Sequence, residues 1–216
     1  MDRINQYKHL TFIFLPLMYL AGSIGLQISQ TKTLFEILIP FNLVASLILL
    51  LWFHEDWNLA FIKYACLTFL IGFGVEVMGV KTGLIFGHYQ YGKALGFGFW
   101  GVPLTIGCNW LMLNYCVNTI ADRLKTSIFI KITVAALLMT ALDYILEPTA
   151  IYLGFWNWEN GIIPFKNYVA WFLVSFVIST VYFYSNFKRK NALAFLLFCL
   201  QIFFFISFKI VLFLKK

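Results

Sequence analysis

The sequence predicts an all-α protein, a polytopic membrane helix bundle of about seven transmembrane helices, with residues 1–216 forming a single integral membrane domain. Composition is the first observation behind this fold class. Hydrophobic residues make up 62% of the chain and charged residues only 12%, which leaves too little polar surface for a soluble domain. Several apolar runs also reach the roughly 20 residues needed to cross a bilayer. No long polar segment remains to form a separate soluble domain.

Seven apolar runs define the expected helices, at residues 9–28, 33–53, 60–79, 101–121, 127–147, 167–185 and 191–214. The first run follows basic residues, as the apolar part of a signal peptide does. It continues without a clear small-residue cleavage site, so we expect it to be a spanning helix.

Basic residues near the helix ends predict the orientation. If successive helices cross the membrane in opposite directions, nine lysines and arginines lie on the same side as the N-terminus and six lie on the other side. Because basic residues accumulate in cytoplasmic loops, this excess favours a cytoplasmic N-terminus, and we expect the chain in the cell (inner) membrane. The same topology explains the net charge of +7. The basic residues do not gather on one face, so no nucleic-acid partner is expected.

Two long connections, after the third and the fifth expected helix, resemble each other and emerge on the same membrane face. The first motif region, residues 76–110, contains GFWGVP, and the second, residues 143–171, contains GFWNWENGIIP. Each region has a carboxylate near a helix end, then a GFW triplet, then a glycine and a proline before the next helix. The first region holds eight of the 14 glycines, which let backbone and large rings approach closely. Together the two regions predict a pocket roofed by aromatic side chains.

Three carboxylates are the candidate catalytic groups. Asp143 and Glu147 are four residues apart, so they share one face of a helix, and Glu76 is expected at a similar depth. An ionisable side chain inside a membrane is costly and marks a functional site by default, while an interfacial carboxylate that touches water is the alternative for each. Two acids withdrawn from water together retain at least one proton near neutral pH, which provides a general acid.

Several patterns that suggest other chemistry do not fit. The segment GFGFWG at residues 96–101 matches the dinucleotide fingerprint, but no strand precedes it. His9 and His54 fall on the face opposite His88, so the histidines cannot build a di-iron site, and the turn at His54 is expected to face water. The four cysteines have no short paired spacing. We therefore expect no metal and no cofactor.

The segments GVKTGLIFGHYQYGKALGFGFWGVPLTIGCNW and DYILEPTAIYLGFWNWENGIIPFKNYVAW together resemble the membrane carotenoid-biosynthesis hydratases. This family includes bisanhydrobacterioruberin hydratase and the gamma-carotene hydratase of bacteria, and the resemblance covers about residues 70–175. It implies an enzyme of the hydro-lyase class that adds water across the terminal double bond of an acyclic carotenoid. The product would be a tertiary alcohol, formed without a redox cofactor, and the substrate would enter from the lipid bilayer.

Hydration of such an alkene needs a strong proton donor, surroundings that tolerate a tertiary carbocation, and water held in place. We expect Asp143 to be the acid, and Glu76 and Glu147 to position or deprotonate the water, although the acid and base roles can be exchanged. Aromatic faces stabilise the cation. The residues expected to bind the substrate are Tyr89, Tyr91, Trp100, Asn109, Trp110, Trp156, Trp158 and Asn167.

Three other functions remain open. A carotenoid end-group cyclase also begins with alkene protonation, but an internal double bond captures its cation. A small transporter would use the intramembrane acids as a proton relay, with polar residues in both halves of the bundle. Here we expect the polar groups to gather near one face. A pigment-binding protein without catalysis is the third alternative, and association with other carotenoid-pathway enzymes is left open.

Overall fold

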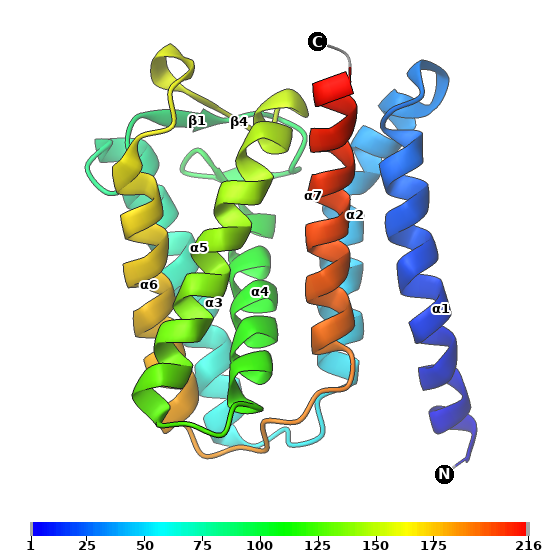
Figure 1. The fold of residues 1–216 in the computed structure, drawn as a ribbon, viewed down its shortest axis with the longest axis vertical. Helices are drawn as coiled ribbons and strands as arrows, with labels where there is room; N and C mark the ends of the chain where they lie inside the picture. The colour runs from blue at the N-terminus through cyan, green and yellow to red at the C-terminus, as the bar shows by residue number, and fades with distance from the viewer. Residues whose placement is uncertain (1, 215–216) are drawn as a thin grey trace.

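The computed structural model describes residues 2–214 as a bundle of helices that run roughly along one axis (Figure 1). Seven α-helices are present in this part of the chain: α1 (Asp2–Gly25), α2 (Ser29–Trp52), α3 (Leu59–Thr82), α4 (Leu104–Asp122), α5 (Ile128–Tyr152), α6 (Phe165–Tyr184) and α7 (Ala194–Leu214). Helices α3 to α6 form one group, and α1, α2 and α7 stand beside it (Figure 1). The predicted fold class, an all-α membrane bundle, is confirmed.

Helix α4 lies at the centre of the bundle and packs against α2, α3, α5, α6 and α7. These five neighbours are the helices that are long and apolar enough to cross a membrane, as judged by length and composition within the described residues. Most side chains of α4 are buried. A helix that other helices shield from lipid does not need an apolar surface, and this explains why α4 carries the buried Asn114 and Asn118.

The predicted helix bounds agree with the observed ones to within a few residues, except at the start of α1 and the end of α5. The sequence predicts that the fifth helix ends before Pro148, but α5 continues through this proline to Tyr152. Membrane helices tolerate an internal proline because neighbouring groups compensate for the lost hydrogen bond. The longer helix keeps Glu147 inside the bundle, where only 1% of its surface is exposed.

Short strands, which the sequence did not predict, join the two long connections. Their bounds are β1 (Tyr89–Tyr91), β2 (Gly98–Phe99), β3 (Val102–Pro103) and β4 (Trp156–Trp158), followed by the 3₁₀ turn η1 (Glu159–Gly161). Strands β2 and β3 form a hairpin within the first connection. Strand β1 pairs with β4 in antiparallel orientation, and this pairing spans one end of the bundle (Figure 1). The two motif regions are therefore linked by main-chain hydrogen bonds.

At the opposite end of the bundle, the turn between α2 and α3 packs against the protein. His54 is only 4% exposed, its Nδ1 lies 2.6 Å from the hydroxyl of Tyr115, and its ring stacks on Phe61. The expectation that this histidine faces water is therefore wrong. A hydrogen bond and a stacked ring hold it inside, which the sequence of a short polar turn does not reveal.

Candidate active site

The three candidate carboxylates line one small cavity beneath the β1–β4 pair. Glu76 comes from α3, and Asp143 and Glu147 come from α5. All three are buried, with exposed fractions of 4%, 0% and 1%. The cavity has a volume of about 20 Å³, which is enough for one water molecule. The structure thus brings together three acids and a space of the size of water.

Glu76 accepts hydrogen bonds from three side chains. The hydroxyls of Tyr89 and Tyr91 both donate to its Oε2, the second at 2.7 Å, and the indole N–H of Trp110 donates to its Oε1 at 3.0 Å. Burial is the main cause that raises the pKa of both tyrosines, and the neighbouring Glu76 carboxylate raises it further. Both tyrosines therefore keep their protons and act as donors. Because every neighbour donates, Glu76 has the surroundings of a hydrogen-bond acceptor.

Glu147 accepts hydrogen bonds from two indoles of the second connection. Trp156 Nε1 and Trp158 Nε1 donate to the same oxygen, Oε2, at 3.0 and 2.9 Å. Its surroundings therefore differ from those of Glu76, which is held by phenols and by an indole from α4.

Asp143 is the least satisfied of the three acids. The amide of Asn167 donates to its Oδ2 at 2.6 Å. Its other oxygen, Oδ1, is buried and has no hydrogen-bond partner within residues 2–214. An ionised carboxylate gains from donors on both oxygens, whereas a protonated one can leave an O–H free to donate. The geometry therefore suits Asp143 to the role of proton donor better than Glu76.

The register of β1 and β4 explains how four rings reach the two glutamates. Tyr89 lies opposite Trp158, and Tyr91 lies opposite Trp156. Alternate residues of a strand point to the same face, so all four rings lie on one side of the pair, while Gln90 between the tyrosines is exposed. The ring centroids are 4.9 Å apart in the first pair and 5.9 Å in the second. One small sheet thus supplies the donors for acids on two different helices.

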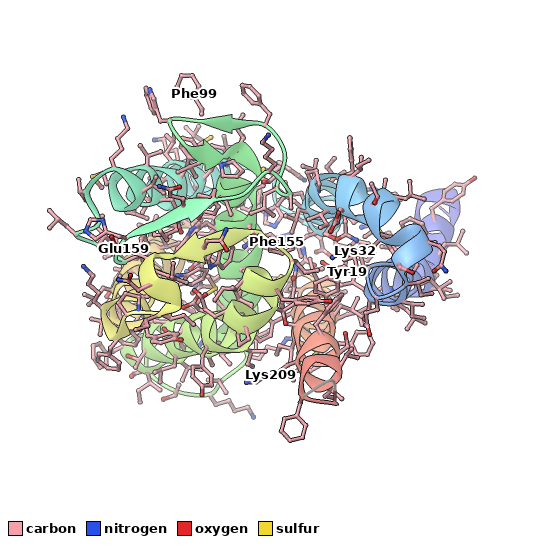
Figure 2. All side chains as sticks on the ribbon, turned by 90° about the horizontal axis from the view of Figure 1, so that it is seen from above. Tyr19, Lys32, Phe99, Phe155, Glu159 and Lys209 are labelled. Carbon is pink, nitrogen blue, oxygen red and sulfur yellow. The ribbon has the colours of Figure 1, made fainter. Side chains whose placement is uncertain are left out.

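Two residues expected to bind substrate are not brought to the cavity. Trp100 is 60% exposed at the tip of the β2–β3 hairpin, where Lys81 lies over its ring, and its neighbour Phe99 is at the outer edge of the molecule (Figure 2). Asn109 is half-buried and does not line the cavity, because adjacent residues of a helix point about 100° apart and Trp110 occupies the inward position. The other six expected binding residues contact a carboxylate.

Two residues that line the cavity were not predicted, Phe86 and Trp171. Trp171 is buried, and its ring stacks on Trp110 at 4.4 Å. Its position four residues after Asn167, on the same face of α6, is the signal that could have identified it. Phe86 has no comparable signal, because its place depends on how the loop after α3 folds back.

No group of three or more histidine, cysteine, aspartate or glutamate side chains that could hold a metal ion is present in the described part of the chain.

The fold and the site define a helical membrane protein with a buried acidic centre beneath two aromatic connections. Comparison with known families shows that the chain belongs to the family described as "Carotenoid biosynthesis protein", which matches residues 32–216. This confirms the predicted resemblance to a membrane family of carotenoid biosynthesis.

One curated relative is bisanhydrobacterioruberin hydratase of Haloarcula japonica, with 30% identity over 135 residues. The match covers 56% of this chain and 44% of the relative, so the chain spans less than half the length of that protein. No solved structure matches the chain.

Proposed function

We propose that the chain is a carotenoid hydratase that adds water across the terminal double bond of an acyclic carotenoid end group. The observation that carries this proposal is the set of three buried carboxylates around a cavity of about 20 Å³. A relative with 30% identity over 135 residues bears the name of a hydratase. The proposed reaction needs a proton donor, a proton acceptor and one water molecule, and it needs no redox cofactor.

In the proposed mechanism, Asp143 donates a proton from Oδ1 to the terminal alkene, and a tertiary carbocation forms. The faces of the surrounding aromatic rings stabilise this cation. The water oxygen then forms the new C–O bond while one of its protons passes to a glutamate, for which Glu76 is our first choice. Transfer of that proton back to Asp143 restores the starting state, so the net reaction consumes only water and alkene.

A second, larger cavity provides space for the polyene chain of the proposed substrate. It has a volume of about 300 Å³ and lies between α1, α2 and α7, with almost entirely apolar walls. Phe155 lines it, and the next residue, Trp156, lines the acidic cavity. Figure 2 shows Phe155 at the junction between the two groups of helices, with Tyr19 across from it. We propose that the polyene occupies this groove and that the β4 connection moves aside to admit the end group.

Gly22 offers a test of the groove. It lines this cavity, and no heavy atom lies within 4 Å of the position that a Cβ would take. Gly22→Phe is therefore expected to fold normally, to fill the groove, and to lower the yield of hydrated carotenoid several-fold. Gly74→Phe is the matched control, because this glycine of α3 has the same open space but lines neither cavity. Equal yields from the two variants would contradict a polyene in the groove.

The proposed function itself is tested by expressing the chain in a bacterium that produces lycopene and analysing the pigments by mass spectrometry. A hydratase yields carotenoids heavier by one or two water molecules. A cyclase yields an isomer of unchanged mass and altered absorption, and this result would replace hydration by cyclisation. Unchanged lycopene and unchanged longer acyclic carotenoids would count against both reactions.

A further inference from the structure

Buried polar side chains continue from the acidic site toward the opposite end of the bundle. Besides the hydroxyl of Tyr64, five of them carry a buried oxygen without a hydrogen-bond partner within residues 2–214: Thr68 of α3, Asn114 and Asn118 of α4, and Ser175 and Ser179 of α6. None of these residues is more than 1% exposed. We call this set the polar column. The expectation that polar groups gather only near one face is therefore wrong, because the acids do so but the amides and hydroxyls do not.

The hydroxyls of the polar column differ from other hydroxyls in the same helices. A serine or threonine inside a helix ordinarily donates to the carbonyl four residues earlier. Thr180 does so to Phe176 at 2.8 Å, and Ser185, the residue that directly follows α6, does so to Val181 at 2.7 Å. Ser175 and Ser179, on the same helix, have no such bond. Their hydroxyls are therefore available to a partner that lies between the helices.

The two asparagines are only half satisfied. Their amide nitrogens donate to the carbonyls of Trp110 and Asn114, at 3.0 and 2.7 Å, which leaves each Oδ1 as a free acceptor. Because an unpaired buried polar atom is unfavourable, five of them in one region call for a small ligand that both donates and accepts. Water is the ligand with this property that most often fills such positions in proteins.

Aromatic contacts fix the position of the polar column between two layers of rings. At the upper end, Trp110 and Trp171 stack with centroids 4.4 Å apart, and Gly72 packs directly against Trp110. At the lower end, the rings of Tyr64 and Tyr182 are 5.2 Å apart. Helices α3, α4 and α6 contact one another, and each places its polar residues between these two layers. A step of four residues is a rise of about 6 Å, so Asn114 and Asn118, like Ser175 and Ser179, are separated by about this distance along the bundle.

Both ends of the column reach ionisable groups. Above it, Trp110 donates to Glu76, and Trp171 lines the cavity that contains Asp143. Below it, the Tyr182 hydroxyl lies 3.2 Å from that of Thr119. The guanidinium group of Arg189 packs against the face of the Tyr182 ring. Arg189 belongs to a surface cluster with Asp122 and Lys131. The polar column therefore extends from the acidic site toward the end of the bundle at which α4 and α6 end.

We propose that the polar column binds a row of water molecules and supplies the acidic site from this opposite face. Its purpose rests on the proposed function. Each turnover consumes one water molecule and releases no net proton, while the carotenoid fills the lipid-facing approach. Replacement water then reaches Asp143 through the column, past the stacked rings of Trp110 and Trp171. The cavity beside the acids holds about one molecule, so a continuing supply is needed for repeated turnover.

Radiolytic hydroxyl-radical footprinting of the full chain in lipid nanodiscs tests the column without reference to activity, because internal water generates radicals that label adjacent side chains. Tyr64 and Tyr182 are fully buried. After correction for intrinsic reactivity, they are expected to be labelled several-fold more than Phe208, which is equally buried in α7. Labelling at the level of Phe208 would overturn the proposal.

Matched variants distinguish an effect on the polar column from a general destabilisation of α6. The double variant Ser175→Ala/Ser179→Ala is expected to lower labelling of Tyr64 several-fold and to slow formation of hydrated carotenoid. Thr180→Ala removes a hydroxyl that already bonds to its own helix, and it is expected to change neither quantity. Unchanged labelling in a correctly inserted double variant would overturn the column.

The outcomes of these experiments also test the polar column and the proposed hydration reaction separately. Strong labelling of Tyr64 in a chain that forms no hydrated carotenoid would support the column and overturn the proposed hydratase. Substrate-independent proton flux through proteoliposomes would overturn water supply as the purpose of the column and favour a transporter.

Discussion

Replacing Asp143 with asparagine is expected to abolish the hydrated carotenoid. A positioned general acid typically contributes about 10²–10⁴-fold to a rate, and an amide cannot donate a proton to an alkene. The substitution is mild for the fold, because the asparagine oxygen can still accept the hydrogen bond from Asn167 that the carboxylate accepts at 2.6 Å. The measurement is the mass-resolved pigment profile of lycopene-producing cells that express the variant at the level of the parent chain.

The matched control for this variant is Glu36→Gln. Glu36 is a carboxylate of α2 that is partly exposed and faces Lys32 at 3.7 Å, and it lines neither cavity. It is expected to leave the product unchanged. Full hydration by Asp143→Asn would remove Asp143 from the mechanism and shift the role of the acid to a glutamate.

Replacing Glu76 with glutamine is expected to remove activity and also to destabilise the protein. Three donors converge on this carboxylate, and the amide N–H₂ of glutamine would face at least one of them. A buried donor left without its acceptor lowers the free energy of unfolding by about 1–3 kcal/mol. In a chain of this size, each kcal/mol corresponds to a fall of about 2–4 °C in the unfolding midpoint. Thermal unfolding in detergent measures this fall.

Two further variants define what the Glu76 result means. Glu159→Gln changes an exposed glutamate in the same pair of connections, so its unfolding midpoint is expected to match that of the parent chain. Tyr91→Phe removes a single donor and keeps the carboxylate, so it is expected to lower the midpoint less than Glu76→Gln and to retain some activity. A Glu76→Gln variant as stable as the parent would contradict the converging hydrogen bonds.

The helices were predictable because lipid imposes a simple rule on their composition. Runs of about 20 apolar residues have few alternatives in a bilayer, and their bounds were correct to within a few residues at most ends. The end of α5 was predicted wrongly because a membrane helix can continue through an internal proline. Whether it does so at Pro148 depends on the residues packed around the proline, which the local sequence does not show.

The sequence predicted the three acids of the candidate site, but it predicted only some of the aromatic residues around them. A carboxylate in an apolar run is conspicuous, and Glu76, Asp143 and Glu147 do meet around one cavity. Aromatic residues are common throughout the chain, so sequence alone does not separate Tyr91, which binds Glu76, from Trp100, which lies on the surface. The difference depends on the pairing of β1 with β4, which joins segments far apart in the sequence.

The polar column was not predictable for a related reason. A serine, threonine or asparagine inside a helix usually bonds to its own backbone, as Thr180 does, so a single residue of this type carries little information. Only the packing of the chain shows that Thr68, Asn118 and Ser179 are buried without partners on three helices that contact one another.

The hydrogen bonds of the two glutamates also bear on how the chain is built into its membrane. The tyrosines that bind Glu76 follow it by 13 and 15 residues, and the tryptophans that bind Glu147 follow it by 9 and 11. Each acid therefore has its own donors in the segment synthesised directly after it. As each helix leaves the ribosome and enters the bilayer, its acid can be shielded within its own hairpin before later helices arrive, and pairing of β1 with β4 then joins two units that are already formed.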